Sequence, residues 1–171
     1  MENMNEEVKK TKKPRSNKYN VGKKTERIYD GIVFDSKMEM DYYIEKILPS
    51  LESGEIKSFE RQKRFLLQPD FKRDGKSIRK IEYVADFYIT YADGHVLVVD
   101  VKGYPDSVAT LKRKMFWYQY PELDYIWLTK VVRYGGWLPK EEVDKIRRAN
   151  KRAKEKAAIE KAKQEAEEQK E

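Results

Sequence analysis

The chain has 171 residues, enough for one domain with a hydrophobic core but not for two. Apolar and charged residues each make up 39% of the sequence, and a charged share well above the roughly 25% of an ordinary globular domain indicates that part of the chain is solvated tail. The net charge of +7 favours a polyanionic partner, and the absence of cysteine, with His95 as the single histidine, excludes disulfides, cysteine-based zinc sites, cysteine nucleophiles and nucleases built on paired histidines.

The first segment, residues 1–24, is a basic arm without apolar periodicity. Its cations end with Lys23 and Lys24, for which a contact with nucleic acid and a role in a solvated tail are equally good interpretations. Residues 1–13 lack the apolar core of a secretory signal, and no apolar run in the chain approaches the roughly 20 residues of a membrane span. We therefore expect no membrane partner.

A β-hairpin and a helix should follow the arm. Asp30-Gly31 is a two-residue turn signal between two short β-prone runs, which predicts the hairpin. Ser36 is a good helix N-cap, and apolar residues recur behind it at helical spacing. Pro49 should kink this helix and Gly54 should end it.

The middle of the chain is rich in apolar and aromatic residues and predicts several strands. These strands cover residues 56–59, 65–67, 78–90 and 96–102. Asp74-Gly75 predicts another hairpin turn, and His95 belongs to a turn before the last strand rather than to a catalytic or metal site. That last strand is apolar on both faces, so we expect it at the centre of the sheet.

The last third should contain a helix over residues 108–120, a buried strand over residues 123–129 and, from Pro139 onward, a charged helix with a thin apolar stripe. In the strand, Ile126 and Leu128 should lie on one face, and Tyr125 and Trp127 on the other.

This order of elements predicts an α/β domain at residues 25–138, in which helices flank a central mixed sheet. The basic arm of residues 1–24 precedes it, and a charged helix or tail of residues 139–171 follows it.

A carboxylate and a lysine follow the apolar run of the predicted central strand. Strand periodicity puts Asp100 and Lys102 on one face and Val101 on the other. A carboxylate at the end of a buried strand is costly unless it is paired or bound to a cation. A simple Asp–Lys ion pair that caps the strand would also explain this short pattern.

The preceding strand carries a second carboxylate, Asp86, among apolar and aromatic neighbours. The turn before His95 lies roughly midway between Asp86 and Asp100, so antiparallel pairing would bring the two aspartates together. Two adjacent carboxylates repel each other unless a cation lies between them, and magnesium prefers such oxygen ligands. The pattern therefore predicts a metal-assisted site for phosphodiester hydrolysis.

A further carboxylate, Glu39, lies at the start of the first predicted helix and has two interpretations. The string from Ser36 to Glu39 matches a capping box, in which Glu39 bonds back to the Ser36 N–H. Glu39 could instead join the two aspartates at the metal. One carboxylate cannot fully serve both roles.

Together these motifs resemble the PD-(D/E)XK nuclease signature. Glu39 on a first helix, Asp86 on a strand and Asp100-x-Lys102 on the next strand follow its order. More narrowly, the stretches at residues 30–39, 83–87, 99–103 and 111–116 look like a family of small phage and prophage endonucleases related to phage Holliday-junction resolvases. The resemblance covers roughly residues 18–130. Ala85 stands where many members have proline, and Asp100 where glutamate is frequent.

The resemblance implies a restriction-endonuclease-like core and a division of roles among the site residues. Asp86 and Asp100 would coordinate Mg²⁺, which Mn²⁺ can replace, with the Val101 carbonyl as a further ligand. Lys102 would orient or deprotonate the attacking water and offset charge on the phosphate, and Glu39 would join through water or a second metal. The implied substrate is branched DNA such as a four-way junction, cut by a homodimer in the cytoplasm of a bacterial host.

Basic residues on other segments are candidates for phosphate contacts. They are Arg79 and Lys80 beside the middle strands and Lys112, Arg113 and Lys114 on the helix after the central strand. Trp117, Tyr118, Trp127 and Trp137 could stack on bases, but their spacing favours packing in the core.

No helix-turn-helix, zinc finger or basic zipper is present, so recognition should rely on shape and phosphates. A noncatalytic nucleic-acid-binding protein with a structural Asp/Lys cluster remains the alternative to the nuclease.

Overall fold

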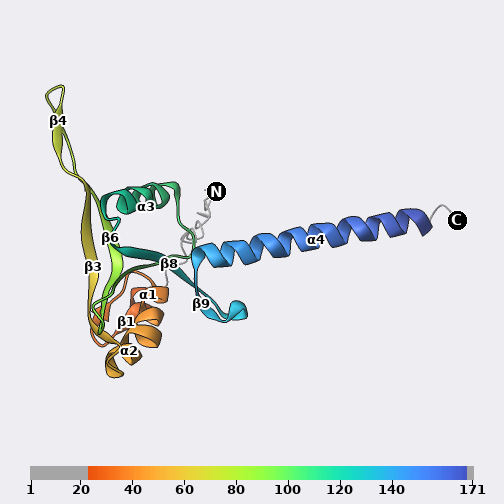
Figure 1. The fold of residues 1–171 in the computed structure, drawn as a ribbon, viewed down its shortest axis with the longest axis horizontal. Helices are drawn as coiled ribbons and strands as arrows, with labels where there is room; N and C mark the ends of the chain where they lie inside the picture. The colour runs from red at the N-terminus through yellow and green to blue at the C-terminus, as the bar shows by residue number, and fades with distance from the viewer. Residues whose placement is uncertain (1–22, 169–171) are drawn as a thin grey trace, which may run out of the picture.

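The computed structural model describes residues 23–168 (Figure 1). Its strands are β1 (Ile28–Tyr29), β2 (Ile32–Val33), β3 (Ile56–Gln68), β4 (Phe71–Arg73), β5 (Lys76–Ile78), β6 (Ile81–Tyr91), β7 (Val96–Val101), β8 (Asp124–Val131) and β9 (Gly136–Pro139). Its helical segments are η1 (Lys24–Arg27), α1 (Lys37–Tyr42), η2 (Tyr43–Ile47), α2 (Leu48–Glu52), α3 (Ser107–Gln119), η3 (Val132–Tyr134) and α4 (Lys140–Glu168).

A mixed five-stranded sheet in the order β3-β6-β7-β8-β9 forms the centre of this α/β domain. β7 is the middle strand, as its continuous apolar run predicts, and it pairs antiparallel with β6 and parallel with β8. The connection between the two parallel strands runs through α3. Helices α1 and α2 lie on one side of the sheet and α3 lies on the other (Figure 1).

The predicted turns and caps are confirmed at the start of the domain. Asp30 and Gly31 both have positive φ, 48° and 72°, as the two-residue turn between β1 and β2 requires. The Ser36 side chain accepts a hydrogen bond from the Glu39 N–H and begins α1. The distortion expected at Pro49 takes the form of a π-helical segment, η2, which ends just before this proline. Proline has no N–H to donate to the preceding turn, so the regular hydrogen-bond pattern of the helix is interrupted there.

Two of the predicted strand boundaries were wrong. Residues 56–59 and 65–67 belong to one continuous strand, β3, which pairs with β6 along nearly its whole length. The expected strand at residues 78–90 is divided at Arg79 and Lys80 into β5 and β6. β4 and β5, joined by the Asp74-Gly75 turn, form a separate hairpin that projects from the domain (Figure 1). Strand β9 was not predicted from the sequence.

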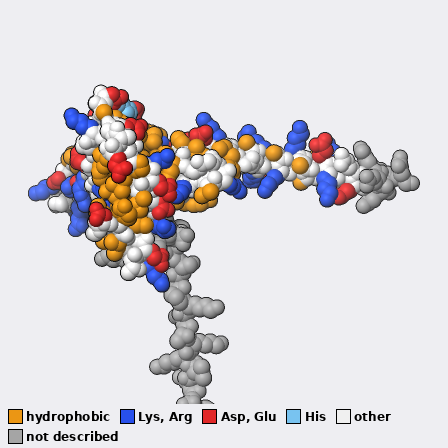
Figure 2. Space-filling view, turned by 90° about the horizontal axis from the view of Figure 1, so that it is seen from below, with side chains coloured by type: hydrophobic (Ala, Val, Ile, Leu, Met, Phe, Trp, Pro, Cys, Tyr) orange, Lys and Arg blue, Asp and Glu red, His pale blue; other side chains and the backbone are white. Residues whose placement is uncertain are grey.

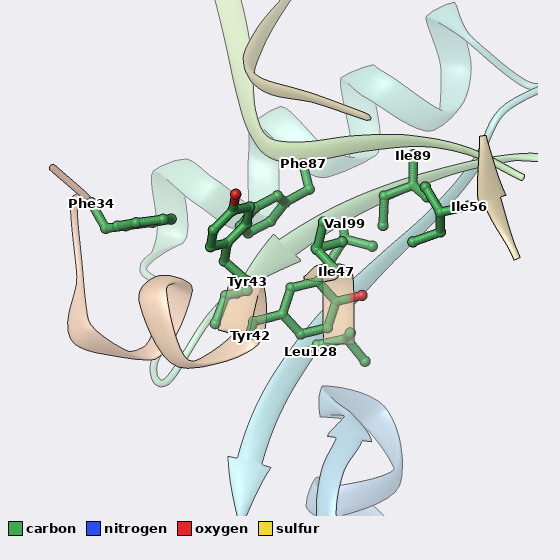
Figure 3. Close-up of a cluster of buried hydrophobic side chains, with 10 residues drawn as sticks. Phe34, Tyr42, Tyr43, Ile47, Ile56, Phe87, Ile89, Val99 and Leu128 are labelled. Carbon is green, nitrogen blue, oxygen red and sulfur yellow. The ribbon is translucent and has the colours of Figure 1, made fainter. Parts of the chain in front are cut away.

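Each face of the sheet buries its own hydrophobic cluster. The cluster under α1, η2 and α2 combines helix residues such as Tyr42 and Ile47 with Phe87 and Val99 of the strands (Figure 3). The cluster under α3 is built around Phe116. The predicted facing of β8 is confirmed, since Ile126 and Leu128 pack in the first cluster and Tyr125 and Trp127 in the second.

Helix α4 packs on the domain only through its first turns, where Val143 is fully buried. Further along, its side chains are exposed, and Figure 2 shows basic and acidic groups alternating along the projecting part. Within the described residues, no helix is long and apolar enough to cross a membrane.

Candidate active site

The pairing of β6 with β7 brings the two predicted aspartates together. Phe87 pairs with Val99, and the next position in this antiparallel register sets Asp86 opposite Asp100. Both carboxyl groups are buried. One oxygen of Asp86, Oδ2, accepts a hydrogen bond of 2.7 Å from the Val101 N–H, which fixes this side chain against β7.

The two oxygens of Asp100 have different surroundings. Oδ2 accepts a hydrogen bond from the Tyr83 hydroxyl, and the Tyr125 hydroxyl lies 3.4 Å from it. Oδ1 is buried without a hydrogen-bond donor in the described part of the chain. The Lys102 ammonium lies 3.1 Å from Oδ1 and forms an ion pair with it. One oxygen of Asp100 is therefore held by hydroxyl groups, and the other faces the Lys102 ammonium.

Burial and mutual repulsion disfavour the charged form of this pair of carboxyl groups. The pKa of Asp86 is raised well above the ordinary range, first by burial and then by the negative charge of Asp100, a hydrogen bond between the two carboxyl groups and the charge of Glu39. Burial alone would lower the pKa of Lys102, but the charges of Asp100, Asp86 and Glu39 outweigh it and raise this pKa. The site thus concentrates negative charge around one lysine.

A chain of buried polar side chains supports Asp100 from the α3 side of the sheet. The Trp127 indole N–H donates to the Tyr125 hydroxyl, which bonds in turn to the Tyr83 hydroxyl. Burial, followed by the charge of Asp100, raises the pKa of both tyrosines, so they remain protonated donors. Sequence patterns did not reveal this role, because alternating Tyr and Trp residues in strands are typical of ordinary core packing.

Arg113 packs beside these side chains, and its burial contradicts the prediction that it contacts DNA. It was expected to contact DNA, but its side chain is buried, with a relative exposure of 8% for the residue. Its guanidinium group stacks over the rings of Trp117 and Trp127 and forms an ion pair with Glu141 of α4. The helical position of Arg113 faces the sheet, so we exclude it from the DNA-contacting set.

Glu39 is buried at the start of α1 and functions as a helix cap in this structure. Its carboxylate accepts hydrogen bonds from the Ser36 hydroxyl (2.9 Å) and from the Asp35 N–H (3.3 Å), rather than from the Ser36 N–H of the predicted capping box. Burial raises its pKa, while these hydrogen bonds and the charge of Lys102 act in the opposite direction. The charge of Glu39 is therefore close enough to raise the pKa of Asp86, but both of its carboxylate oxygens already accept hydrogen bonds.

Gln62 is a residue of this region that the sequence did not reveal. It lies in the middle of β3, between Arg61 and Lys63, whose partners in β6 are Phe87 and Ala85. Its φ is +53°, in the left-handed region that a glutamine rarely adopts, and its Nε2 is buried without a partner in the described chain. Ala85 packs in the cluster under α3, whereas Phe87 packs in the cluster under α1. Residues two apart on a regular strand lie on the same face of the sheet, so the alternation of side chains along β6 is interrupted at Asp86.

The donor set suits magnesium better than a metal that needs a complete protein cage. Among residues 23–168 no three acidic or histidine side chains are grouped closely enough to bind a metal ion by themselves. Magnesium requires only one or two protein carboxylates and keeps several waters. The facing carboxyl groups of Asp86 and Asp100, with an Asp100 Oδ1 that accepts no hydrogen bond in the described chain, fit that requirement.

The other basic residues of the predicted DNA-contacting set lie at the surface to different degrees. Arg79 and Lys114 are exposed, and Lys80 is exposed but paired with Glu82. Lys112 is partly engaged, since its ammonium donates to the Glu82 carbonyl. Lys23 is exposed, whereas the arm of residues 1–22 and the Lys24 side chain lie outside what the structure describes.

The expectation of core packing holds for Trp127 but fails for Tyr118. Trp127 is buried and Trp137 packs against the first cluster. Trp117 is half-exposed, and Tyr118 has a relative exposure of 88% on the outer face of α3. A helix with both faces rich in aromatic residues gives no signal in the sequence of which face is buried.

The fold and the site together define an α/β protein with two buried, facing aspartates and a lysine at the end of its central strand. The chain matches the family described as "Protein of unknown function (DUF1064)" over residues 16–136, which is most of its length, and it belongs to this family. No curated protein matches the chain.

Proposed function

We propose that the protein is a metal-dependent DNA endonuclease and that its mixed sheet with flanking helices is a PD-(D/E)XK core. The observation that carries the proposal is the arrangement of Asp100, whose Oδ1 lacks a hydrogen bond, beside Lys102 and opposite Asp86. Buried carboxylates that face each other are costly unless a cation joins them. The clustered charge is thus best explained by a magnesium site.

In this proposal the residues of the chain have separate tasks. Asp86, Asp100 and the Val101 carbonyl bind Mg²⁺, with Mn²⁺ as a substitute, and the ion supplies Lewis-acid activation of a phosphodiester. Lys102 orients or deprotonates the attacking water and offsets the charge that develops on the phosphate. Val101 N–H keeps Asp86 in place through its hydrogen bond. Glu39 holds the start of α1 beside the site and assists through water or a second ion.

The proposed substrate is branched DNA, and four-way junctions are its best candidate. Basic side chains occur on separated elements, including the β4–β5 hairpin, Arg79 and Lys80 at its base, and Lys112 and Lys114 on α3. Separated phosphate contacts fit a broad or branched substrate better than one groove of a straight duplex. Two symmetric cuts in a junction would require a homodimer.

The test is to incubate the purified protein with linear, forked and four-way DNA, with and without magnesium. We expect cleavage only with the metal ion and most strongly on branched DNA. Cleavage that persists in excess chelator would contradict the metal site, and equal cleavage of all three substrates would reduce the proposal to a general endonuclease.

The Lys102–Asp100 ion pair supports a second candidate function, because it already compensates one charge without metal. Under this alternative the protein binds nucleic acid without cutting it, and the Asp/Lys cluster is structural. Lys102→Ala separates the two. The nuclease should lose about 10²–10³-fold in cleavage rate while metal affinity, followed by calorimetry, is largely kept. A binding protein would show no metal-dependent cleavage in either form.

A further inference from the structure

An open groove of about 380 Å³ lies between the end of β3 and the C-terminal half of α3. Leu67 and Met115 belong to the hydrophobic cluster beneath it. Four longer side chains complete its lining: Gln68, Lys114, Tyr118 and Gln119. Its volume lies in the range of small-molecule sites, roughly 300–1,000 Å³. The candidate active site does not contribute to it.

The groove presents groups that have no partner within the described chain. Tyr118 is 88% exposed, and its ring contacts no other described aromatic ring. The side chains of Lys114, Gln68 and Gln119 form no hydrogen bond or ion pair with residues 23–168. These groups match what an unpaired nucleotide requires. The exposed ring offers a stacking surface for the base, the ammonium group offers a contact for the phosphate, and the two amides offer hydrogen-bond partners for the base edge.

The β4–β5 hairpin extends this surface. Gln68 is the last residue of β3, and β4 begins three residues later at Phe71. The exposed cations of the hairpin and its base are Lys72, Arg73, Lys76, Arg79 and Lys80, against the acidic Asp70 and Asp74. Arg73 is paired with Asp74 and Lys80 with Glu82, so Lys72, Lys76 and Arg79 have no ion pair with another described residue. The surplus of positive charge beside the groove favours a phosphate-bearing ligand over a neutral or acidic one.

We propose that this groove binds an unpaired nucleotide of a single-stranded nucleic acid, with the base stacked on Tyr118 and a phosphate at Lys114. The binding itself does not depend on the proposed cleavage. Gln68 pairs with Ile81, and Asp86 lies five residues further along β6, or roughly 17 Å at about 3.3 Å per residue. If the nuclease function holds, the groove would select DNA in which an unpaired strand lies beside the scissile bond.

The proposal is tested on the full chain in chelator, so that no cleavage can occur. Fluorescence anisotropy with a labelled oligo-thymidine measures single-strand affinity, and a blunt-ended duplex of two fully complementary strands, of equal total nucleotide number, serves as the second probe. Tyr118→Ala should weaken oligo-thymidine binding by about five- to 150-fold, the equivalent of about 1–3 kcal/mol for one stacked base. Tyr118→Phe keeps the ring and should retain the affinity.

The matched control is Leu111→Ala, which removes another exposed apolar side chain of α3 outside the groove. It should leave both affinities unchanged. Lys114→Ala should reduce the salt dependence of single-strand binding by about 0.7 in log–log slope, as expected for one lost phosphate contact.

Unchanged oligo-thymidine affinity in Tyr118→Ala would overturn the proposal, and so would an equal loss for the duplex, since stacking requires an unpaired base. Because all variants are compared without metal, the result is independent of whether magnesium later activates cleavage.

Discussion

Asp86 is the residue whose ionisation should affect the stability of the protein most directly. Its pKa is raised well above the ordinary value, chiefly by burial and then by Asp100. A carboxyl group of this kind binds its proton more tightly in the folded chain than in the unfolded chain. Its contribution to stability is therefore present at low pH and is lost as the pH rises from the unfolded value of about 3.9 towards the raised one.

We expect Asp86→Asn to raise the melting temperature of the metal-free protein at neutral pH. The amide keeps the shape of the side chain and its oxygen can still accept the Val101 N–H bond, but it removes the buried negative charge. Thermal unfolding in chelator between about pH 4 and 8 measures the effect, which should vanish at the acid end. Asp70→Asn, at an exposed position, is the control. A lower melting temperature at neutral pH would show that the carboxylate is not strained.

The tyrosines behind Asp100 predict a second effect at the scale of single residues. Tyr83→Phe removes the hydroxyl that holds Oδ2, which should lower magnesium affinity by about tenfold, the lower end of the effect of losing a partner of a metal ligand. Tyr120→Phe is a matched control, because Tyr120 packs against the same cluster but donates to the Leu66 carbonyl. Calorimetric titration with magnesium compares them, and equal affinities would leave Tyr83 with a packing role alone.

At the scale of elements, Glu39 connects the cap of α1 with the candidate active site. Separate carboxylate oxygens of Glu39 accept the two hydrogen bonds, and Glu39→Gln leaves one oxygen, which can still accept from the Asp35 N–H while the amide group donates to the Ser36 hydroxyl. The Ser36 side chain still caps the Glu39 N–H, so α1 should keep its start. We expect the melting temperature to change little and the magnesium-dependent cleavage rate to fall. Thermal unfolding and cleavage assays on the same preparation test this expectation. Full activity in the variant would leave Glu39 with the capping role only.

Local signals predicted the elements that depend on local chemistry. The turns at Asp30-Gly31 and Asp74-Gly75, the Ser36 cap and the facing of β8 are all confirmed, because each depends on backbone conformation or on strand period two. The continuity of β3 was missed because residues 60–64 are polar and charged, and their pairing with β6 is a long-range effect. Strand β9 is short and begins at the second of two consecutive glycines, a pair that predicts only a break in the chain.

The candidate site was predictable only in part. Asp86, Asp100 and Lys102 could be found because carboxylates within apolar strands are anomalous and the turn spacing sets their register. The burial of Arg113, the bonds of Tyr83 and the strained backbone of Gln62 depend on how α3 and β3 pack against β6 and β7. Sequence periodicity contains no information on those contacts.

At the scale of the whole molecule, the basic segments predict a preference among DNA shapes. The projecting hairpin, α3 and the arm of residues 1–24 carry their cations on separate parts of the chain. We expect tighter binding to a four-way junction than to a linear duplex of equal length, with both affinities falling steeply as salt rises. Removal of residues 1–24 should weaken both and flatten the salt dependence. Competition binding at fixed ionic strength measures the preference, and equal affinities would contradict it.

The central claim is that Asp86 and Asp100 hold a catalytic metal ion while other residues bind the DNA. The most direct measurement compares magnesium-dependent cleavage by the wild type, Asp100→Asn and the control Asp124→Asn, with DNA affinity measured in parallel. The proposal predicts cleavage by the wild type and the control, no detectable cleavage by Asp100→Asn, and similar DNA affinity for all three, because the carboxylates bind the metal ion and not the duplex. Cleavage by Asp100→Asn at the wild-type rate would contradict the site.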